Sequence, residues 1–224
     1  MQGINEEQVA LKSENVLGQV DIIDLKETLE NTDVKLDIIS AKNNVRVAIL
    51  TENGFEQVEL TSPKDALENV GAKVDIISPK NGKVKAWNKT NWGIEINVDK
   101  KLADANPIEY DALVLPGGVM NPDKLRQNSV AIKFVKYFLQ SGKLVAAICH
   151  SPQILIETGL LAGKTMTSYP SLKTDLKNAG VNWIDKEVVH DNNLITSRKP
   201  ADLYAFNSEL IIALSLQNNF RGLA

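Results

Sequence analysis

Five short apolar runs alternate with segments of helical periodicity between residues 45 and 216 of this 224-residue chain. The runs are 45–50, 73–77, 112–115, 144–148 and 194–196, and the clearest helical patterns are 65–70, 129–139 and 204–216. Such alternation is typical of an α/β domain in which right-handed crossovers place helices on both faces of a parallel sheet. Ligands of these domains bind at the carboxyl ends of the strands. We therefore predict a doubly wound, mainly parallel sheet sandwiched by helices.

The single cysteine follows one of these apolar runs, where the chain is expected to turn into a helix. In AAICHSPQ, Cys149 lies between the strand and Pro152, which suits the first turn of a helix. The small residues Ala147 and Ser151 leave room for the tight turn that presents a nucleophile in α/β hydrolases. Helix N-terminal amides lower a thiol pKa from about 8.5, and the His150 amide could donate to an oxyanion. A lone cysteine in an apolar run is otherwise most often a buried packing residue.

The stretch AICHSPQ resembles the nucleophile region of the ThiJ/PfpI superfamily, where the common form is AICHGPQ. Further segments resemble family blocks in family order: GFEQVEL (54–60), DALVLPGG (111–118), PDKLR (122–126), TSYPSLKTDLKNAG (167–180) and TSRKPADL (196–203). Separated blocks in a fixed order arise by chance far less often than one short motif. The resemblance covers about residues 45–216. It implies a flavodoxin-like fold and the PfpI branch of intracellular cysteine proteases, deglycases and glyoxalases.

The resemblance also implies roles for residues around Cys149. A family glutamate that follows the first strand and hydrogen-bonds the cysteine sulfur is matched by Glu56, which would act as a proton shuttle. The amides of Gly118 and His150, together with that of Gly117, are assigned to an oxyanion hole. Taken alone, Glu56 equally suits a helix N-terminus, and the glycines equally suit a simple loop.

Three further residues are assigned through the resemblance. In hexameric PfpI proteases an acid from a neighbouring subunit pairs with the histidine after the cysteine, and Asp123 is the best match here. The preceding loop, 119–121, is one residue longer than in archaeal members, and Asp123 alone equally suits a helix start. Tyr169 matches a tyrosine near the cysteine, although an isolated aromatic more often packs. Ser151 replaces the usual glycine and is expected to narrow the pocket or hydrogen-bond substrate.

Composition limits the partners and cofactors. A net charge of −3 without a basic cluster interleaved with aromatics argues against nucleic acid. No apolar run approaches the roughly 18 residues of a membrane span, and no signal pattern opens the chain, so a cytoplasmic location is expected. His150 and His190 are the only histidines, and their spacing builds no metal site. We therefore expect no metal or cofactor, with His190 in a solvated loop, and the resemblance implies a homo-oligomer, either a dimer or a hexamer.

Residues 8–43 align with residues 46–81 at a constant offset of 38, with 17 identities in 36 positions. Identity at this density indicates a duplicate of the domain's own opening strand–helix–strand unit. The first copy has glycine where the second has Glu56. We therefore predict an extension without the chemistry, residues 1–44, which adds to a sheet edge or a subunit contact, followed by a catalytic domain over residues 45–224. The alternative is a partly ordered extension that makes no functional contribution.

The expected chemistry is attack of the Cys149 thiolate on a carbonyl. A methylglyoxal-type aldehyde would form a hemithioacetal that Glu56 helps rearrange to a hydroxyacid, whereas an amide would form an acyl-enzyme that water releases. Small reactive carbonyls, their glycated adducts and peptides or proteins are therefore the expected substrates, with a stress-protective function. The alternative is a non-catalytic redox sensor or holdase chaperone in which Cys149 is oxidised.

Overall fold

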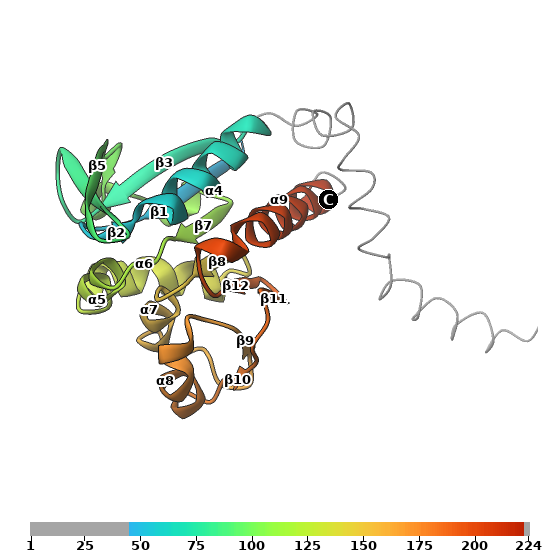
Figure 1. Cartoon of the computed structure of the whole chain (residues 1–224). Helices are drawn as coiled ribbons and strands as arrows, with labels where there is room; N and C mark the ends of the chain where they lie inside the picture. The colour runs from blue at the N-terminus through green and yellow to red at the C-terminus, as the bar shows by residue number, and fades with distance from the viewer. Residues whose placement is uncertain (1–44, 222–224) are drawn as a thin grey trace, which may run out of the picture.

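The computed structural model describes residues 45–221, with side chains as far as residue 217. Figure 1 shows a central sheet with helices on both sides. The predicted N-terminal extension, residues 1–44, lies outside the described residues. Within residues 45–221, no helix has the length and apolar character needed to cross a membrane.

A seven-stranded sheet forms the centre of the domain, in the order β11-β12-β8-β7-β1-β3-β6. Its strands are β1 (Arg46–Leu50), β3 (Lys73–Ser78), β6 (Lys100–Lys101), β7 (Ala112–Leu115), β8 (Leu144–Ile148), β11 (Val188–Asp191) and β12 (Leu194–Ser197). Every neighbouring pair is parallel except β11 with β12. The predicted doubly wound, mainly parallel sheet is thus confirmed, and the five apolar runs coincide with β1, β3, β7, β8 and β12.

Helices cover both faces of this sheet, which is why β7 and β8 are apolar throughout and β1 is apolar after Arg46. The helices are α4 (Gln57–Asn69), α5 (Met120–Arg126), α6 (Ser129–Gln140), α7 (Pro152–Ile156), α8 (Lys173–Asn178) and α9 (Leu203–Arg221). Successive strand residues point to opposite faces, so Val47 and Ile49 of β1 pack with α4 and α9. Ala48 and Leu50 belong to the other core, which α5, α6, α7 and α8 cover (Figure 1).

Short elements at the periphery complete the domain. A three-stranded sheet contains β2 (Phe55–Glu56), β4 (Lys83–Asn88) and β5 (Asn91–Asn97), and β9 (Thr165–Met166) pairs with β10 (Asn182–Trp183). Single 3-10 turns are η1 (Leu102–Asp104), η2 (Pro107–Glu109), η3 (Pro170–Leu172) and η4 (Pro200–Asp202). The pairing of β2 with β4 fixes the segment just before α4, and with it the direction in which α4 begins.

The strand order brings three loops together at one edge of the sheet. The progression of the chain across the sheet reverses between β1 and β7, and α/β folds bind ligands at such a reversal. Because β8, β7 and β1 are parallel neighbours, their carboxyl ends lie side by side. The segments that leave these three ends carry the groups of the candidate active site.

Candidate active site

Cys149 lies on a sharp bend between β8 and α7. Its φ angle is +63°, a left-handed conformation that is unfavourable for a non-glycine residue and persists only where the surroundings impose it. The Cys149 amide donates to Ser197 O at 3.0 Å, and Tyr169 N donates to Cys149 O at 2.8 Å. Both backbone polar groups of the cysteine are therefore held, and the predicted turn from strand to helix is present.

A buried carboxyl group faces the thiol from the first turn of α4. Glu59 is 0% exposed and hydrogen-bonds Cys149. Glu59 Oε2 accepts a hydrogen bond from Gly117 N at 3.0 Å. The other oxygen, Oε1, is buried and has no hydrogen-bond partner within the described residues. The carboxyl group is therefore buried without full hydrogen bonding.

The predicted thiol partner, Glu56, was the wrong glutamate. Helix α4 begins at Gln57, so Glu56 precedes the helix and has an extended backbone with φ −66° and ψ 123°. Pairing with β4 holds Glu56 there, whereas Glu59 lies one turn later on the helix face that buries Pro63 and Leu67. An acid on the apolar face of a helix is the signal that identifies Glu59 from the sequence.

Burial dominates the proton affinities of this pair. It raises the pKa of Glu59 from 4.5 to about 8, so the carboxyl group is largely protonated at neutral pH. Burial also raises the pKa of the Cys149 thiol, contrary to the expected lowering, and the Glu59 carboxylate raises it further. The two groups titrate together. While Glu59 keeps its proton, it carries no negative charge that would repel the Cys149 thiolate, and its carboxyl O–H can donate a hydrogen bond to the sulfur.

Two backbone amides point at the sulfur. The amides of Gly118 and His150 both hydrogen-bond Cys149 and favour its thiolate form. Donors in this position can also stabilise an oxyanion that forms on a carbon bound to the sulfur. The prediction of a third donor, Gly117, was wrong, because the Gly117 amide already donates to Glu59.

The close approach of the loop after β7 depends on two glycines. A Cβ atom at Gly117 would lie 2.4 Å from Glu59 Oε2 and 2.7 Å from Cys149 Cβ. Gly118 has a φ of +79°, and a Cβ atom there would lie 2.5 Å from Gly54 O. The backbone can reach the sulfur and the carboxyl group only because these two positions lack side chains.

An aromatic pair lies beside Cys149. The His150 ring stacks on the Tyr169 ring, with centroids 4.5 Å apart, and Tyr169 is 40% exposed. Burial lowers the pKa of His150, so the imidazole is neutral at pH 7. Asp123 is exposed on α5 and contacts Gln127. Within the described residues no hydrogen bond or ion pair joins Asp123 to His150, and pairing across a subunit interface stays a prediction.

Ser151 does not line the pocket, contrary to the prediction. It is 0% exposed, and its Oγ donates to Pro116 O at 2.5 Å. The hydroxyl group therefore points into the loop after β7 and cannot reach a substrate. Proximity to the nucleophile in sequence does not determine which side of a tight bend a side chain takes.

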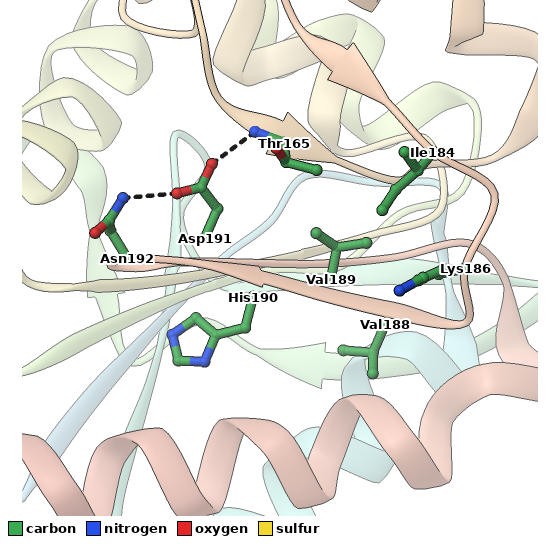
Figure 2. A pocket seen from close by; sticks show the side chains of 8 residues that line it. All are labelled: Thr165, Ile184, Lys186, Val188, Val189, His190, Asp191 and Asn192. Carbon is green, nitrogen blue, oxygen red and sulfur yellow. Dashed lines mark hydrogen bonds between the residues drawn. The ribbon is translucent and has the colours of Figure 1, made fainter. Parts of the chain in front are cut away.

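A separate hollow of about 490 Å³ lies beside β11 and contains none of these groups (Figure 2). Its lining residues are Thr165, Ile184, Lys186, Val188, Val189, His190, Asp191 and Asn192. The Asp191 carboxylate accepts hydrogen bonds from Thr165 N and Asn192 Nδ2, both at 2.6 Å. His190 was predicted to lie in a loop, but it lies in strand β11. Among the residues that the structure describes, no group of three or more His, Cys, Asp or Glu side chains could hold a metal ion.

Residues 45–213, which include every group around Cys149, match the DJ-1/PfpI family. The chain belongs to this family. The resemblance drawn from the sequence motifs is therefore confirmed. A protein named deglycase from Pyrococcus abyssi is 50% identical over 119 residues, which make up 53% of this chain and 71% of that protein. Deglycase PfpI from Pyrococcus furiosus is 48% identical over 119 residues, with the same coverage of 53% and 71%.

The solved structures include a two-domain protein from Anabaena variabilis with DJ-1/ThiJ/PfpI-like and ferritin-like domains. It matches this DJ-1/PfpI chain with a TM-score of 0.71 and 39% sequence identity. The match covers 76% of this chain and 48% of that protein, so the chain spans about half its length. The relatives named deglycase support enzymatic activity within the family.

Proposed function

We propose that this DJ-1/PfpI protein is a cofactor-free enzyme in which Cys149 adds to the carbonyl carbon of a small reactive aldehyde or its adduct. One juxtaposition carries the proposal: Glu59, buried and protonated, lies beside the sulfur, and the Gly118 and His150 amides point at it. A nucleophile, an acid–base group and oxyanion donors are the components that carbonyl addition requires. The deglycase names of the relatives agree with this class of substrate.

With methylglyoxal, the Cys149 thiolate forms a bond to the aldehyde carbon and the carbonyl oxygen takes the Glu59 proton, which gives a hemithioacetal. The Glu59 carboxylate then removes the proton from the carbon that bears sulfur, and the resulting enediol is reprotonated at the neighbouring carbon. The product is a lactoyl thioester, and its hydrolysis releases lactate and restores the thiol. Methylglyoxal and water thus become lactate, without an oxidant or a reductant.

Peptide hydrolysis makes a larger demand on the same site. The departing amine must receive a proton, and the neutral His150 has no acidic partner within the described residues. Cys149 is only 6% exposed, so a small aldehyde reaches the sulfur more easily than a polypeptide does. We therefore place aldehydes and their small adducts ahead of peptides.

The test compares the full chain with Cys149→Ser for methylglyoxal consumption and for cleavage of a fluorogenic peptide panel. We expect the wild type to consume the aldehyde and the variant, with an unchanged melting temperature, to lose about 100-fold or more of that rate. An equal rate in the variant would refute covalent catalysis by Cys149. If neither protein consumes aldehyde and both protect an unfolded client equally, the holdase alternative replaces the enzyme.

A further inference from the structure

The carbonyl of Pro116, directly after β7, accepts hydrogen bonds from two buried side chains. Asn121 Nδ2 donates at 2.6 Å and Ser151 Oγ at 2.5 Å. Both residues are 0% exposed, so water does not compete with either donor. The peptide group between Pro116 and Gly117 is therefore held by two side chains, that of Asn121 in α5 and that of Ser151 in the bend after Cys149.

Asn121 also contacts the segment that follows β1. Its Nδ2 also donates to Gly117 O at 3.2 Å, and its Oδ1 accepts a hydrogen bond from Glu52 N at 2.7 Å. Glu52, Pro116 and Ser151 follow β1, β7 and β8, which are consecutive neighbours in the sheet. Two side chains thereby join the carboxyl ends of three adjacent strands.

The two donors come from different elements, Asn121 from α5 and Ser151 from the bend before α7, and they meet on one oxygen atom. We propose that Asn121 and Ser151 are positioning residues that fix the glycine loop and Glu59 against the Cys149 sulfur. Their effect on turnover rests on the proposed function, but their effect on the reactivity of the thiol does not.

A shift of the loop reaches the reacting groups directly. Gly117 N holds Glu59 Oε2 at 3.0 Å, and a Cβ atom at Gly117 would lie 2.7 Å from Cys149 Cβ. Gly118, the next residue, supplies one of the two amides that favour the thiolate. If the Pro116 carbonyl loses a donor, the glycine loop becomes more mobile and the hydrogen bond from the Gly118 amide to the sulfur lengthens. The Cys149 thiolate is then less stabilised.

The experiment measures the rate of Cys149 alkylation by iodoacetamide as a function of pH, which reports the thiolate and needs no substrate. We expect Asn121→Ala and Ser151→Ala each to raise the midpoint of the profile by about 0.5 pH units or more. Ser215→Ala is the matched control, because Ser215 is 5% exposed and its Oγ donates to Ile211 O at 2.8 Å within α9. The control loses a buried side-chain hydrogen bond far in sequence from the glycine loop, and its midpoint should be unchanged.

Unchanged midpoints in both variants, with lower melting temperatures, would overturn the proposal and leave Asn121 and Ser151 as structural residues only. If Asn121→Ala does not fold, Ser151→Gly carries the same expectation and the same power to overturn it, since glycine also removes the hydroxyl group that donates to Pro116 O. If the midpoints shift in the variants but the wild-type chain consumes no methylglyoxal, the positioning role is supported and the proposed function is rejected.

Discussion

The charge states of Glu59 and Cys149 are linked, so neither residue can be described alone. With its pKa raised to about 8, Glu59 carries a proton over most of the neutral range and can give it to the oxygen of a substrate. The same residue becomes a base once that proton has left. Proton transfer of this kind contributes typically about 10²- to 10⁴-fold to an enzymatic rate.

Glu59→Gln separates proton transfer from thiol reactivity. Glutamine keeps an oxygen for the Gly117 amide and an N–H for the sulfur, but it cannot exchange a proton with substrate. We expect methylglyoxal turnover to fall by about 100-fold or more, while iodoacetamide alkylation of Cys149 changes by less than about 10-fold. Glu56→Gln is the matched control and should retain turnover within about 3-fold, because Glu56 makes no hydrogen bond to the sulfur. If Glu56→Gln lost more methylglyoxal turnover than Glu59→Gln, the assignment of Glu59 would be contradicted.

The residue-level predictions failed where they depended on the direction of a side chain, as for Glu56 and Ser151, or of one backbone amide, as for Gly117. The bend at Cys149 and the position of the His150 amide follow from a strand end and a helix start, which the sequence indicates, whereas the Gly118 amide was assigned through the family resemblance. To identify Glu59, one has to know where α4 begins and which of its faces is buried. To place Ser151, one has to know which side of the bend its side chain takes, and that depends on tertiary packing.

At the level of elements, the long apolar strands were predictable and the two-residue strands were not. Strands β7 and β8 are buried and apolar throughout, as are the residues of β1 after Arg46, because helices cover both faces of the sheet. In β3 and β12 only part of the strand is apolar, which was still enough to predict them. Strands β2, β6, β9 and β10 contain two residues each, too few to show a period. Their positions are set by the partners with which they pair.

The edge strand β11 is tied to α9 by one ion pair that depends on pH. His190 Nδ1 lies 2.7 Å from Glu209 Oε1, and that contact, together with nearby Asp191, raises the pKa of His190. The bridge therefore stabilises the fold below the unfolded pKa near 6.5 and is lost as pH rises through the higher folded value. We expect His190→Gln to lower the free energy of unfolding by about 0.5 kcal/mol at pH 5.5 and by nothing measurable at pH 9.

Urea denaturation at the two pH values measures this difference. Glu209→Gln should reproduce the pH dependence, because either substitution removes the same pair. An equal loss of stability at pH 5.5 and pH 9 would show that His190 acts through packing and not through its charge.

At the scale of the whole chain, the duplicated segment lacks two features on which the site depends. Gly54 has a φ of +89°, and a Cβ atom there would lie 2.6 Å from Met120 Cβ, yet the aligned residue 38 positions earlier is Val16. The residue aligned with Glu59 is Asp21, which is one methylene group shorter. Residues 8–43 thus lack two residues that the β1–α4 unit uses, and an extension without the chemistry stays our prediction for this segment.

The active site also affects the stability of the whole domain, because Glu59 is buried without full hydrogen bonding. Its folded pKa of about 8 lies above the ordinary 4.5, so the folded state keeps a proton that the unfolded state releases. The contribution of Glu59 to the free energy of unfolding therefore falls as pH rises from about 4.5 to about 8, by at most about 1.4 kcal/mol per pH unit, and is constant above that range. The buried Glu59 side chain therefore destabilises the folded state least when it is protonated.

Glu59→Gln should remove this pH dependence, since its amide is neutral in both states. Urea unfolding is measured between pH 5 and pH 9 in a Cys149→Ser background, which excludes titration of the thiol. We expect the Glu59→Gln chain to gain stability over its parent steadily from pH 5 to about pH 8 and to keep a constant lead above it. Parallel stability curves across this range would mean that Glu59 is ionised in the folded protein, and the proton that the proposed mechanism assigns to it would then be absent.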